Sequence, residues 1–376
     1  MILPGFVGGS AQSASRSLNV ERSVNLITRV GDSGTPKVPA AMVNAPGCHP
    51  ELLLPSGPIR GLYSLNGQQA WAVAGTSLYE LFPNHTATLV GSVTASTRPV
   101  TWACNGANGY QLLLCSQPNG YLVDLVTGAF SQVVDDGFPT NCAMVAECSG
   151  YALALAAQSN QVNMSTPVDF SAWDGLDFLR VQTNDPIVSM VSANNLVYLL
   201  GGQQSQVWYP SGDTTPFSPV QGVQIETGTA AMFSAIAVGE APSSVLLWVS
   251  RNDNGQGMVY AMNGYSPQRV SSFAVEQMLQ QQPRLDDIIA WTYQQDGHTF
   301  AVFYIPSNDT TWAFDTQAPQ GMNWAERAIW DSNAIRWFPH IGRCHCFAWG
   351  KHLVGSRLNG AIYEMSPAYP SDWIVS

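Results

Sequence analysis

The sequence is poor in charged residues. Only 11% of its 376 residues are Asp, Glu, Lys or Arg, whereas soluble domains usually have about 25%. Intrinsic disorder is not expected, because disordered chains combine low apolar content with high charge, and 45% of this chain is apolar. The polar surface must therefore consist largely of neutral side chains and glycine. Such a surface suits a subunit that is mostly covered by neighbouring subunits.

Basic residues are scarce as well. The chain has 15 Lys and Arg against 26 Asp and Glu, which gives a formal net charge of −11. Proteins that grip nucleic-acid phosphates are basic, so we expect neither tight nor sequence-specific DNA binding. Two interpretations fit the acidic balance: an ordinary solubility charge, or an acidic wall past which DNA slides without sticking.

Long apolar runs are absent. The N-terminus lacks the basic and apolar regions of a signal peptide, and no stretch reaches the roughly 18 apolar residues of a membrane span. We therefore expect folding in a cytosol and no membrane insertion. In that reducing compartment we interpret the cysteines as buried apolar residues rather than disulfides. There are seven of them, at positions 48, 104, 115, 142, 148, 344 and 346.

Amphipathic helices are nearly absent, and short strand-like runs take their place. The best helical candidate is residues 273–281 (FAVEQMLQQ), which Pro283 ends. Elsewhere short apolar or alternating runs are separated by Asn-Gly and Asp-Gly pairs, which favour strands and tight turns. These runs group into seven units that start 41 to 56 residues apart, near Ile59, Val100, Asn141, Pro186, Ser234, Asp287 and Arg343.

Four short strands repeated at this period predict a β-propeller. The fold class is then all-β, with about six to seven four-stranded blades. The seventh unit shows only three strands, and we expect the N-terminal stretch 19–30 (NVERSVNLITRV) to complete it and close the ring. The domains would be an N-terminal arm (1–18), the propeller (19–367) and a C-terminal tail (368–376). A β-sandwich, or two smaller β domains, is the alternative.

Asp296, Gly297 and His298 bring an acid and an imidazole close together in sequence. They stand between two strongly β runs, and Asp-Gly is a preferred pair for a two-residue type I′ turn. General acid–base catalysis would need a further polar partner in a concave site, and none can be named nearby. We interpret the motif as a hairpin corner, with His298 at the start of the next strand.

Cys344, His345 and Cys346 lie on one predicted strand. Its period of two places both thiols on one face and the imidazole on the other. A structural zinc site commonly takes four ligands, and no second cysteine pair follows. We interpret the cysteines as core residues and expect neither a metal nor a cofactor.

Two pairs of neighbouring carboxylates stand at strand ends, Asp135 with Asp136 and Asp286 with Asp287. Paired carboxylates can serve as glycosidase machinery, but at strand ends they are more often solvated turn residues. The common nucleophile, nucleotide and metalloprotease motifs are absent from the sequence. No catalytic residues are therefore predicted.

Aromatic residues are numerous, with 12 tryptophans and 13 tyrosines. Their rings can either stack on sugars or pack between blades. Placement on alternating strand runs favours packing for Trp71, Trp208, Trp248, Trp291, Trp312 and Trp349. Tyr209 and Pro210 leave such a run toward a turn, so Trp208, Tyr209 and Pro210 are candidates for a subunit interface.

A series of strings, in this order, resembles one known family. The strings are ERSVNLITR, PIRGLYSLNG, VAGTSLYEL, QVWYPSGD, NGQGMVYAMNGYSPQRVSS, TYQQDGHTF and WGKHLVGSRLNGAIYEM. They run from about Glu21 to Met365, and they resemble the packaged-DNA stabilisation proteins that form the tail nozzle or hub of short-tailed bacteriophages. No single string is diagnostic; the series and its order carry the resemblance.

The resemblance implies a propeller subunit of a hexameric ring in the virion tail. The ring would lie below the portal and adaptor proteins, retain packaged double-stranded DNA, conduct it without sequence-specific binding, and join tail fibre or spike proteins. Asp135, Asp136, Asp286 and Asp287 are then candidates to line the DNA channel. A carbohydrate-binding or glycan-processing propeller is the alternative function, and a cytosolic propeller scaffold is a third.

Overall fold

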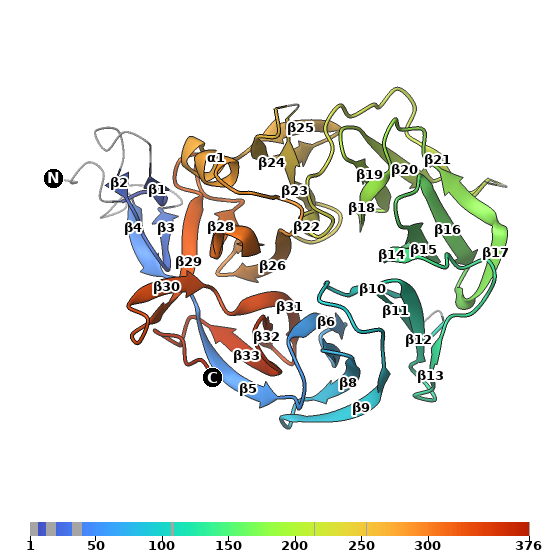
Figure 1. Cartoon of the computed structure of the whole chain (residues 1–376), viewed down its shortest axis with the longest axis horizontal. Helices are drawn as coiled ribbons and strands as arrows, with labels where there is room; N and C mark the ends of the chain where they lie inside the picture. The colour runs from blue at the N-terminus through green and yellow to red at the C-terminus, as the bar shows by residue number, and fades with distance from the viewer. Residues whose placement is uncertain are drawn as a thin grey trace.

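Seven antiparallel β-sheets are arranged around a central axis in a computed structural model, which describes residues 7–12, 20–31, 40–106, 109–213, 215–252 and 254–375 (Figure 1). Each sheet has four strands in sequence order, with two exceptions. The sixth sheet has a fifth strand, and the seventh sheet takes its fourth strand from near the N-terminus. The fold is a seven-bladed β-propeller. The predicted fold class is therefore confirmed, and each predicted unit start falls close to the first strand of a blade.

Blades one to three take up the first part of the ring. Their strands are β6 (Ile59–Leu65), β7 (Gln69–Ala74), β8 (Ser77–Phe82) and β9 (Thr86–Ser92), then β10 (Thr101–Cys104), β11 (Gln111–Ser116), β12 (Asn119–Asp124) and β13 (Phe130–Gln132), then β14 (Cys142–Cys148), β15 (Tyr151–Ala156), β16 (Gln161–Thr166) and β17 (Asp169–Arg180). The first strand of each blade lies nearest the axis and the last lies at the rim (Figure 1).

Blades four to six continue the same order. Their strands are β18 (Ile187–Ala193), β19 (Leu196–Gly201), β20 (Ser205–Pro210) and β21 (Phe217–Pro219), then β22 (Ile236–Val238), β23 (Val245–Arg251), β24 (Gly257–Asn263) and β25 (Ser266–Arg269), then β26 (Ile289–Gln295), β27 (His298–Ile305), β28 (Thr310–Asp315), β29 (Trp324–Asp331) and β30 (Arg336–Pro339). Helix α1 (Phe273–Gln280) joins blades five and six, and Ser272 caps its N-terminus. The predicted helix is confirmed to within one residue.

Blade seven closes the ring with a strand from near the N-terminus. Its order is β31 (Gly342–Ala348), β32 (Lys351–Ser356), β33 (Ala361–Ser366) and β5 (Gly47–Leu53). Gly47 is needed here, since a Cβ atom would lie 2.7 Å from the carbonyl oxygen of Tyr369 and 2.6 Å from that of Ser371. The ring is thus closed by hydrogen bonds between β5 and β33, which removes an exposed sheet edge.

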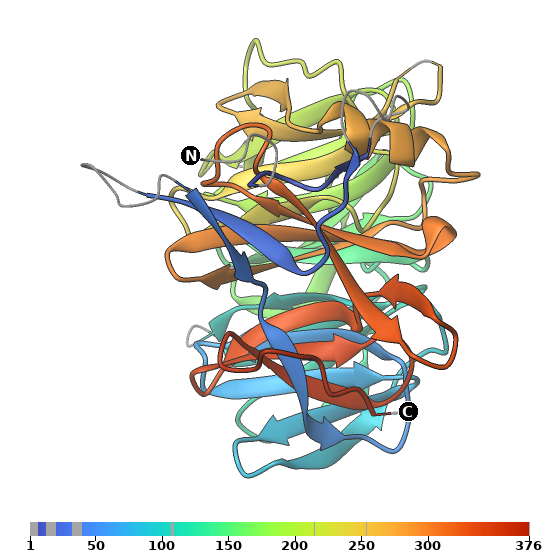
Figure 2. The ribbon, with the colours of Figure 1, turned by 90° about the vertical axis from the view of Figure 1, so that its left-hand side faces the viewer.

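The stretch 19–30 does not close the ring, so this prediction was wrong. Residue 19 lies outside the described residues. β3 (Leu26–Val30) pairs instead with β4 (Ala40–Asn44), and the two short strands β1 (Ala11–Gln12) and β2 (Val20–Glu21) pair with each other. Asn25 donates its backbone N–H to the carbonyl of Glu326, so this segment lies across the rim of blade six (Figure 2). The edge of blade seven was already taken by β5.

The apolar core lies between the blades. Seven clusters of buried apolar residues are found in the described part of the chain, and each joins two neighbouring blades. Five of the six tryptophans expected to pack are buried there or at its edge, with Trp248 fully buried; Trp349 is half-buried. Each blade therefore depends on the next for its apolar cover.

Candidate functional site

The innermost strands of several blades converge at one end of the axis and enclose a cavity of about 500 Å³. We call it the axial arginine pocket. Its wall comes from blades two, four, five, six and seven, close to where their first strands begin. Four arginines line it: Arg98, Arg284, Arg343 and Arg357. Apolar surface from Val188, Met232, Phe233, Ile289 and Tyr304 completes the wall.

Backbone carbonyls fix two of these arginines. Arg343 is 8% exposed and donates from Nη2 to the carbonyl of Thr97. Arg357 donates to the carbonyls of His340 and Pro339, at 3.2 and 3.3 Å. Burial lowers the pKa of Arg343, because a charged guanidinium loses hydration there.

A further arginine lies fully buried behind the pocket. Arg60 donates to the carbonyls of Arg98, Gly75 and Thr94 and to the hydroxyl of Ser116. Burial, and then the charge of Arg343, lower the pKa of Arg60 to about 10. Its four hydrogen bonds join blades one and two, so Arg60 serves the fold.

Sequence reasoning missed this set of arginines. A signal was present, because Arg60 and Arg343 are each the second residue of a first strand, and Arg98 and Arg284 precede other first strands by a few residues. The start of an inner strand points to the same end of the axis in every blade. Charge at that repeated position predicts a charged pocket.

The predicted carboxylate pairs do not come together. Asp286 and Asp287 line the axial arginine pocket, whereas Asp135 and Asp136 line a separate groove between blades two and three. Asp135 accepts the backbone N–H of Gly137 at 2.9 Å, which is an ordinary turn contact. The four residues therefore form no common glycosidase site, and their place in an assembled channel stays a prediction.

Asp286 and Asp287 have different partners. Asp286 forms two hydrogen bonds with Arg284, at 2.7 and 2.9 Å. These bonds lower the pKa of Asp286. Asp287 accepts instead from the Ser307 hydroxyl, at 2.7 and 2.8 Å. Asp286 thus neutralises one of the four arginines, and Asp287 is held by a neutral group.

The three interface candidates differ in exposure. Trp208 is 8% exposed and packs in the core between blades three and four. Tyr209 is 39% exposed, and Pro210 is half-buried. Only Tyr209 of the three presents a large side chain to solvent, so the interface prediction now rests mainly on that residue.

The other end of the axis holds two imidazoles. Nε2 of His345 lies 3.0 Å from Nδ1 of His352, in a cavity of about 470 Å³ that Tyr293, Phe347 and Glu240 also line. Burial lowers the pKa of His345 to about 3, and it lowers the pKa of His352 as well. The predicted alternation is confirmed, because Cys346 is buried in the cluster between blades seven and one while His345 stacks on Trp291.

The Asp-Gly corner is confirmed as a turn. Asp296 and Gly297 have φ values of 51° and 77°, as a type I′ turn requires. His298 does have an acidic partner, which sequence reasoning missed. Its Nδ1 lies 2.7 Å from Oδ2 of Asp315, a buried residue that lies 17 positions further along the chain. The pair joins β27 to the end of β28.

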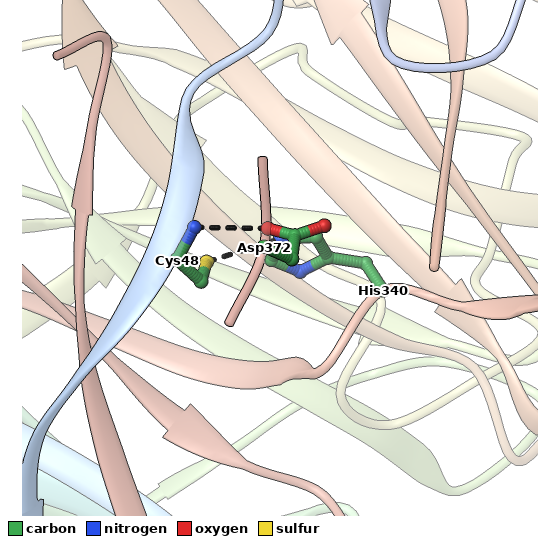
Figure 3. Close-up of side chains that lie close together, drawn as sticks. All are labelled: Cys48, His340 and Asp372. Carbon is green, nitrogen blue, oxygen red and sulfur yellow. Dashed lines mark hydrogen bonds between the residues drawn. The ribbon is translucent and has the colours of Figure 1, made fainter. Parts of the chain in front are cut away.

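Cys48, His340 and Asp372 form the one metal-like cluster in the described residues (Figure 3). Their ligand atoms lie within 4.8 Å of one another, and Sγ of Cys48 is 3.5 Å from Nε2 of His340. All seven cysteines are free thiols. A Cys–His–Asp set is chemically suited to zinc.

The hydrogen bonds of the cluster oppose metal binding. Gly342 donates its backbone N–H to Nδ1 of His340 at 3.0 Å, so Nδ1 keeps its lone pair and the imidazole proton is on Nε2. A metal at Nε2 would force that proton onto Nδ1, against the N–H of Gly342. Asp372 already accepts the backbone N–H of Cys48 at 2.9 Å. The donor set therefore does not fit a metal, and it joins β5 to the C-terminal segment.

Burial of the cluster argues against catalysis by Cys48 and His340 as well. Cys48 is fully buried, so no substrate reaches its thiol. Burial raises the pKa of Cys48, which keeps the thiol protonated and unreactive. Burial, with the charges of Arg327 and Arg357, holds the pKa of His340 well below its usual value.

None of the helices in the described part of the chain has the length and apolar character needed to cross a membrane.

Two solved structures with this fold are named as lyases. A streptogramin B lyase has a TM-score of 0.54 at 9% identity, with 86% of this chain and 98% of that chain covered. The virginiamycin B lyase of Staphylococcus aureus has a TM-score of 0.52 at 8% identity, with 82% and 94% covered. At such identities the likeness shows the fold alone.

A third solved structure is much longer than this chain. It is the extracellular domain of a hybrid two-component system from B. thetaiotaomicron, with a TM-score of 0.54 at 10% identity. The match covers 85% of this chain but 40% of that one. No curated protein matches the sequence.

One family model covers nearly the whole sequence. It is described as "Phage_stabilise: Bacteriophage P22 Gp10, beta-propeller", and it matches residues 9–369. The match includes all seven blades and the closing strand β5. The resemblance found in the sequence is thereby confirmed: the chain belongs to the Phage_stabilise family, the β-propeller family of bacteriophage P22 Gp10.

Proposed function

We propose that this protein is a structural subunit of a bacteriophage tail, a nozzle or hub protein that forms a ring and helps to retain packaged DNA. The observation that carries the proposal is the family match over residues 9–369. The work is mechanical rather than enzymatic. In its support, the buried thiol of Cys48 is protonated, and His298 and Asp315 are engaged in holding two strands together.

The surface supports a subunit enclosed by neighbours. Charged residues make up 11% of the chain, and large aromatic side chains such as Trp330, Trp337 and Tyr209 are at least 36% exposed. Identical subunits would meet through two different faces and close by rotation into a ring of six. Tyr209 and Pro210, at the outer part of blade four, are the interface residues we propose.

An acidic lumen would suit a conduit for DNA. The net charge of −11 repels phosphates, so passing DNA would not dock. Asp135 and Asp136, which lie in an open groove away from the axis, are the better placed of the predicted carboxylates to face a lumen between subunits. Portal and adaptor proteins on one side of the ring, and fibre or spike proteins on the other, are the partners we propose.

A measurement of assembly tests the proposal. Light scattering after size-exclusion chromatography, with and without a portal–adaptor complex, is expected to give the mass of a six-fold ring, and electron cryomicroscopy of the ring shows which side chains face the lumen. Tyr209→Ser should weaken the ring, whereas Tyr265→Ser, an equally exposed tyrosine on blade five, serves as the control. A chain that stays monomeric in both conditions and binds glycans would overturn the proposal in favour of a carbohydrate-binding propeller.

A further inference from the structure

The axial arginine pocket carries an excess of positive charge in an acidic chain. Four of the chain's 15 basic residues line this one cavity. All four are arginines, whose planar guanidinium groups match the geometry of carboxylates and phosphates. Asp286 pairs with Arg284, which leaves three guanidinium groups and a single further carboxylate, that of Asp287.

The other three arginines have only neutral hydrogen-bond partners in the described part of the chain. Arg98 donates to the side-chain oxygen of Gln117, and Arg343 and Arg357 donate to backbone carbonyls. None of the three forms an ion pair with a described carboxylate. Among the described residues, no carboxylate is therefore paired directly with any of these three charges.

Arg343 is the buried arginine of the pocket whose charge is least compensated by its surroundings. Its side chain is buried, and among the described residues its Nε has no hydrogen-bond partner and only Nη2 donates to an acceptor. A buried cation without a counter-ion is unfavourable, because it loses hydration and gains no compensating charge. The nearby charge of buried Arg60 adds to this cost. An anion in the pocket would supply the missing charge.

We propose that the axial arginine pocket binds a small oxyanion, either a carboxylate or a phosphate group. The cavity of about 500 Å³ has the size of an ordinary small-ligand site. Arg98, Arg343 and Arg357 would contact the oxyanion, and the apolar wall formed by Met232 and Phe233 would cover the body of the ligand. This proposal goes beyond the structural role, since the pocket lies within one subunit and does not depend on ring formation.

Two sources of the oxyanion can be separated with two probes. Inorganic phosphate represents a phosphate group. N-acetyl-glutamate amide, whose side chain carries its only charge, represents an acidic side chain on a protein segment that reaches the axis. Each is titrated by isothermal calorimetry into the full chain at low ionic strength, because salt screens exposed charges such as Arg98.

Arginine substitutions show whether binding occurs in the pocket. Arg98→Gln removes an exposed guanidinium at the rim, and Arg357→Gln removes one from the wall; each is expected to weaken the preferred probe about tenfold, the loss of one charge-assisted contact. Arg180→Gln removes an exposed arginine from the outer strand β17 and should leave the affinity unchanged. Thermal melts establish that each variant is folded.

The outcomes are distinct. Saturable binding of one equivalent of either probe, weakened by Arg98→Gln and not by Arg180→Gln, supports the site, and the tighter probe identifies the source of the oxyanion. The absence of saturable binding of both probes overturns the proposal. Equal weakening by Arg98→Gln and Arg180→Gln also overturns it, because the attraction would then be that of any surface arginine. Failure to form a ring would leave this result untouched.

Discussion

Arg22 and Glu326 form a two-pronged ion pair although 304 positions separate them in the sequence. Nε of Arg22 lies 2.8 Å from one carboxylate oxygen of Glu326, and Nη2 lies 2.7 Å from the other. Glu326 is buried, whereas Arg22 is partly exposed. The contact fastens the N-terminal segment onto β29 at the rim of blade six, where Asn25 adds two hydrogen bonds to Ala328.

Arg22→Ala is expected to destabilise the protein by about 1 to 2 kcal/mol, because it leaves the buried carboxylate of Glu326 without its charged partner. The measurement is the free energy of unfolding in urea. Arg180→Ala removes an exposed arginine that has no ion pair among the described residues, and it is the control. Equal stability of the two variants would show that the N-terminal segment is not held by this pair.

The periodicity of the sequence was sufficient to predict the blades. Short alternating runs and Asn-Gly or Asp-Gly corners are local signals, and a repeat of four such strands at this period is typical of a ring of blades. The closing strand was not predictable in this way. Its sequence, GCHPELL, contains a proline, and a proline within a run argues against a strand. Its partner β33 also lies more than 300 positions away in the sequence. Pro50 is tolerated because β5 is an outer strand with one free edge.

The sites were less predictable than the fold. The axial arginine pocket takes its arginines from residue 98 to residue 357, and only the ring brings them together. His298 and Asp315 meet through the register of β27 and β28, which the sequence does not specify. Cys48, His340 and Asp372 come from three segments that only ring closure places side by side. Contacts of this kind depend on the closed topology rather than on a motif.

Gly297→Ala is expected to destabilise the chain by about 1 kcal/mol. Gly297 has a φ of 77°, a conformation in which a Cβ atom meets its own backbone. No other atom lies within 4 Å of the added Cβ, so the cost is one of backbone strain alone. Gly175→Ala is the matched control, since Gly175 does not have a positive φ and an added Cβ would make only an ordinary contact, at 3.9 Å from the Cα atom of Gly137. A loss of stability in urea that is equal for both substitutions would contradict the turn assignment.

Removal of divalent metals is expected to leave the protein unchanged. The imidazole proton of His340 lies on Nε2, the atom that a metal would need, because Nδ1 accepts the N–H of Gly342. Thermal melts of the purified chain should therefore coincide with and without a chelator, and one equivalent of zinc should not raise the midpoint. Stoichiometric zinc in the purified protein, together with a lower midpoint after chelation, would show that the ring closure is a metal site.

The pH dependence of stability is expected to reflect the buried imidazole of His340, whose pKa is held well below 6.5 by burial and by Arg327 and Arg357. Below about pH 6.5 the unfolded chain binds a proton at this residue and the folded chain does not, so stability falls as the pH decreases, by at most about 1.4 kcal/mol per pH unit. His340→Asn keeps an acceptor for the N–H of Gly342 but does not titrate. Because Asn is smaller and loses the contact of Nε2 with Cys48, the variant should be less stable at pH 7.5. Because Asn does not titrate, the variant should lose less stability between pH 6.5 and pH 5.5, as measured by urea unfolding. An unchanged slope in the variant would show that His340 is protonated in the folded protein, which its burial and its two cationic neighbours argue against.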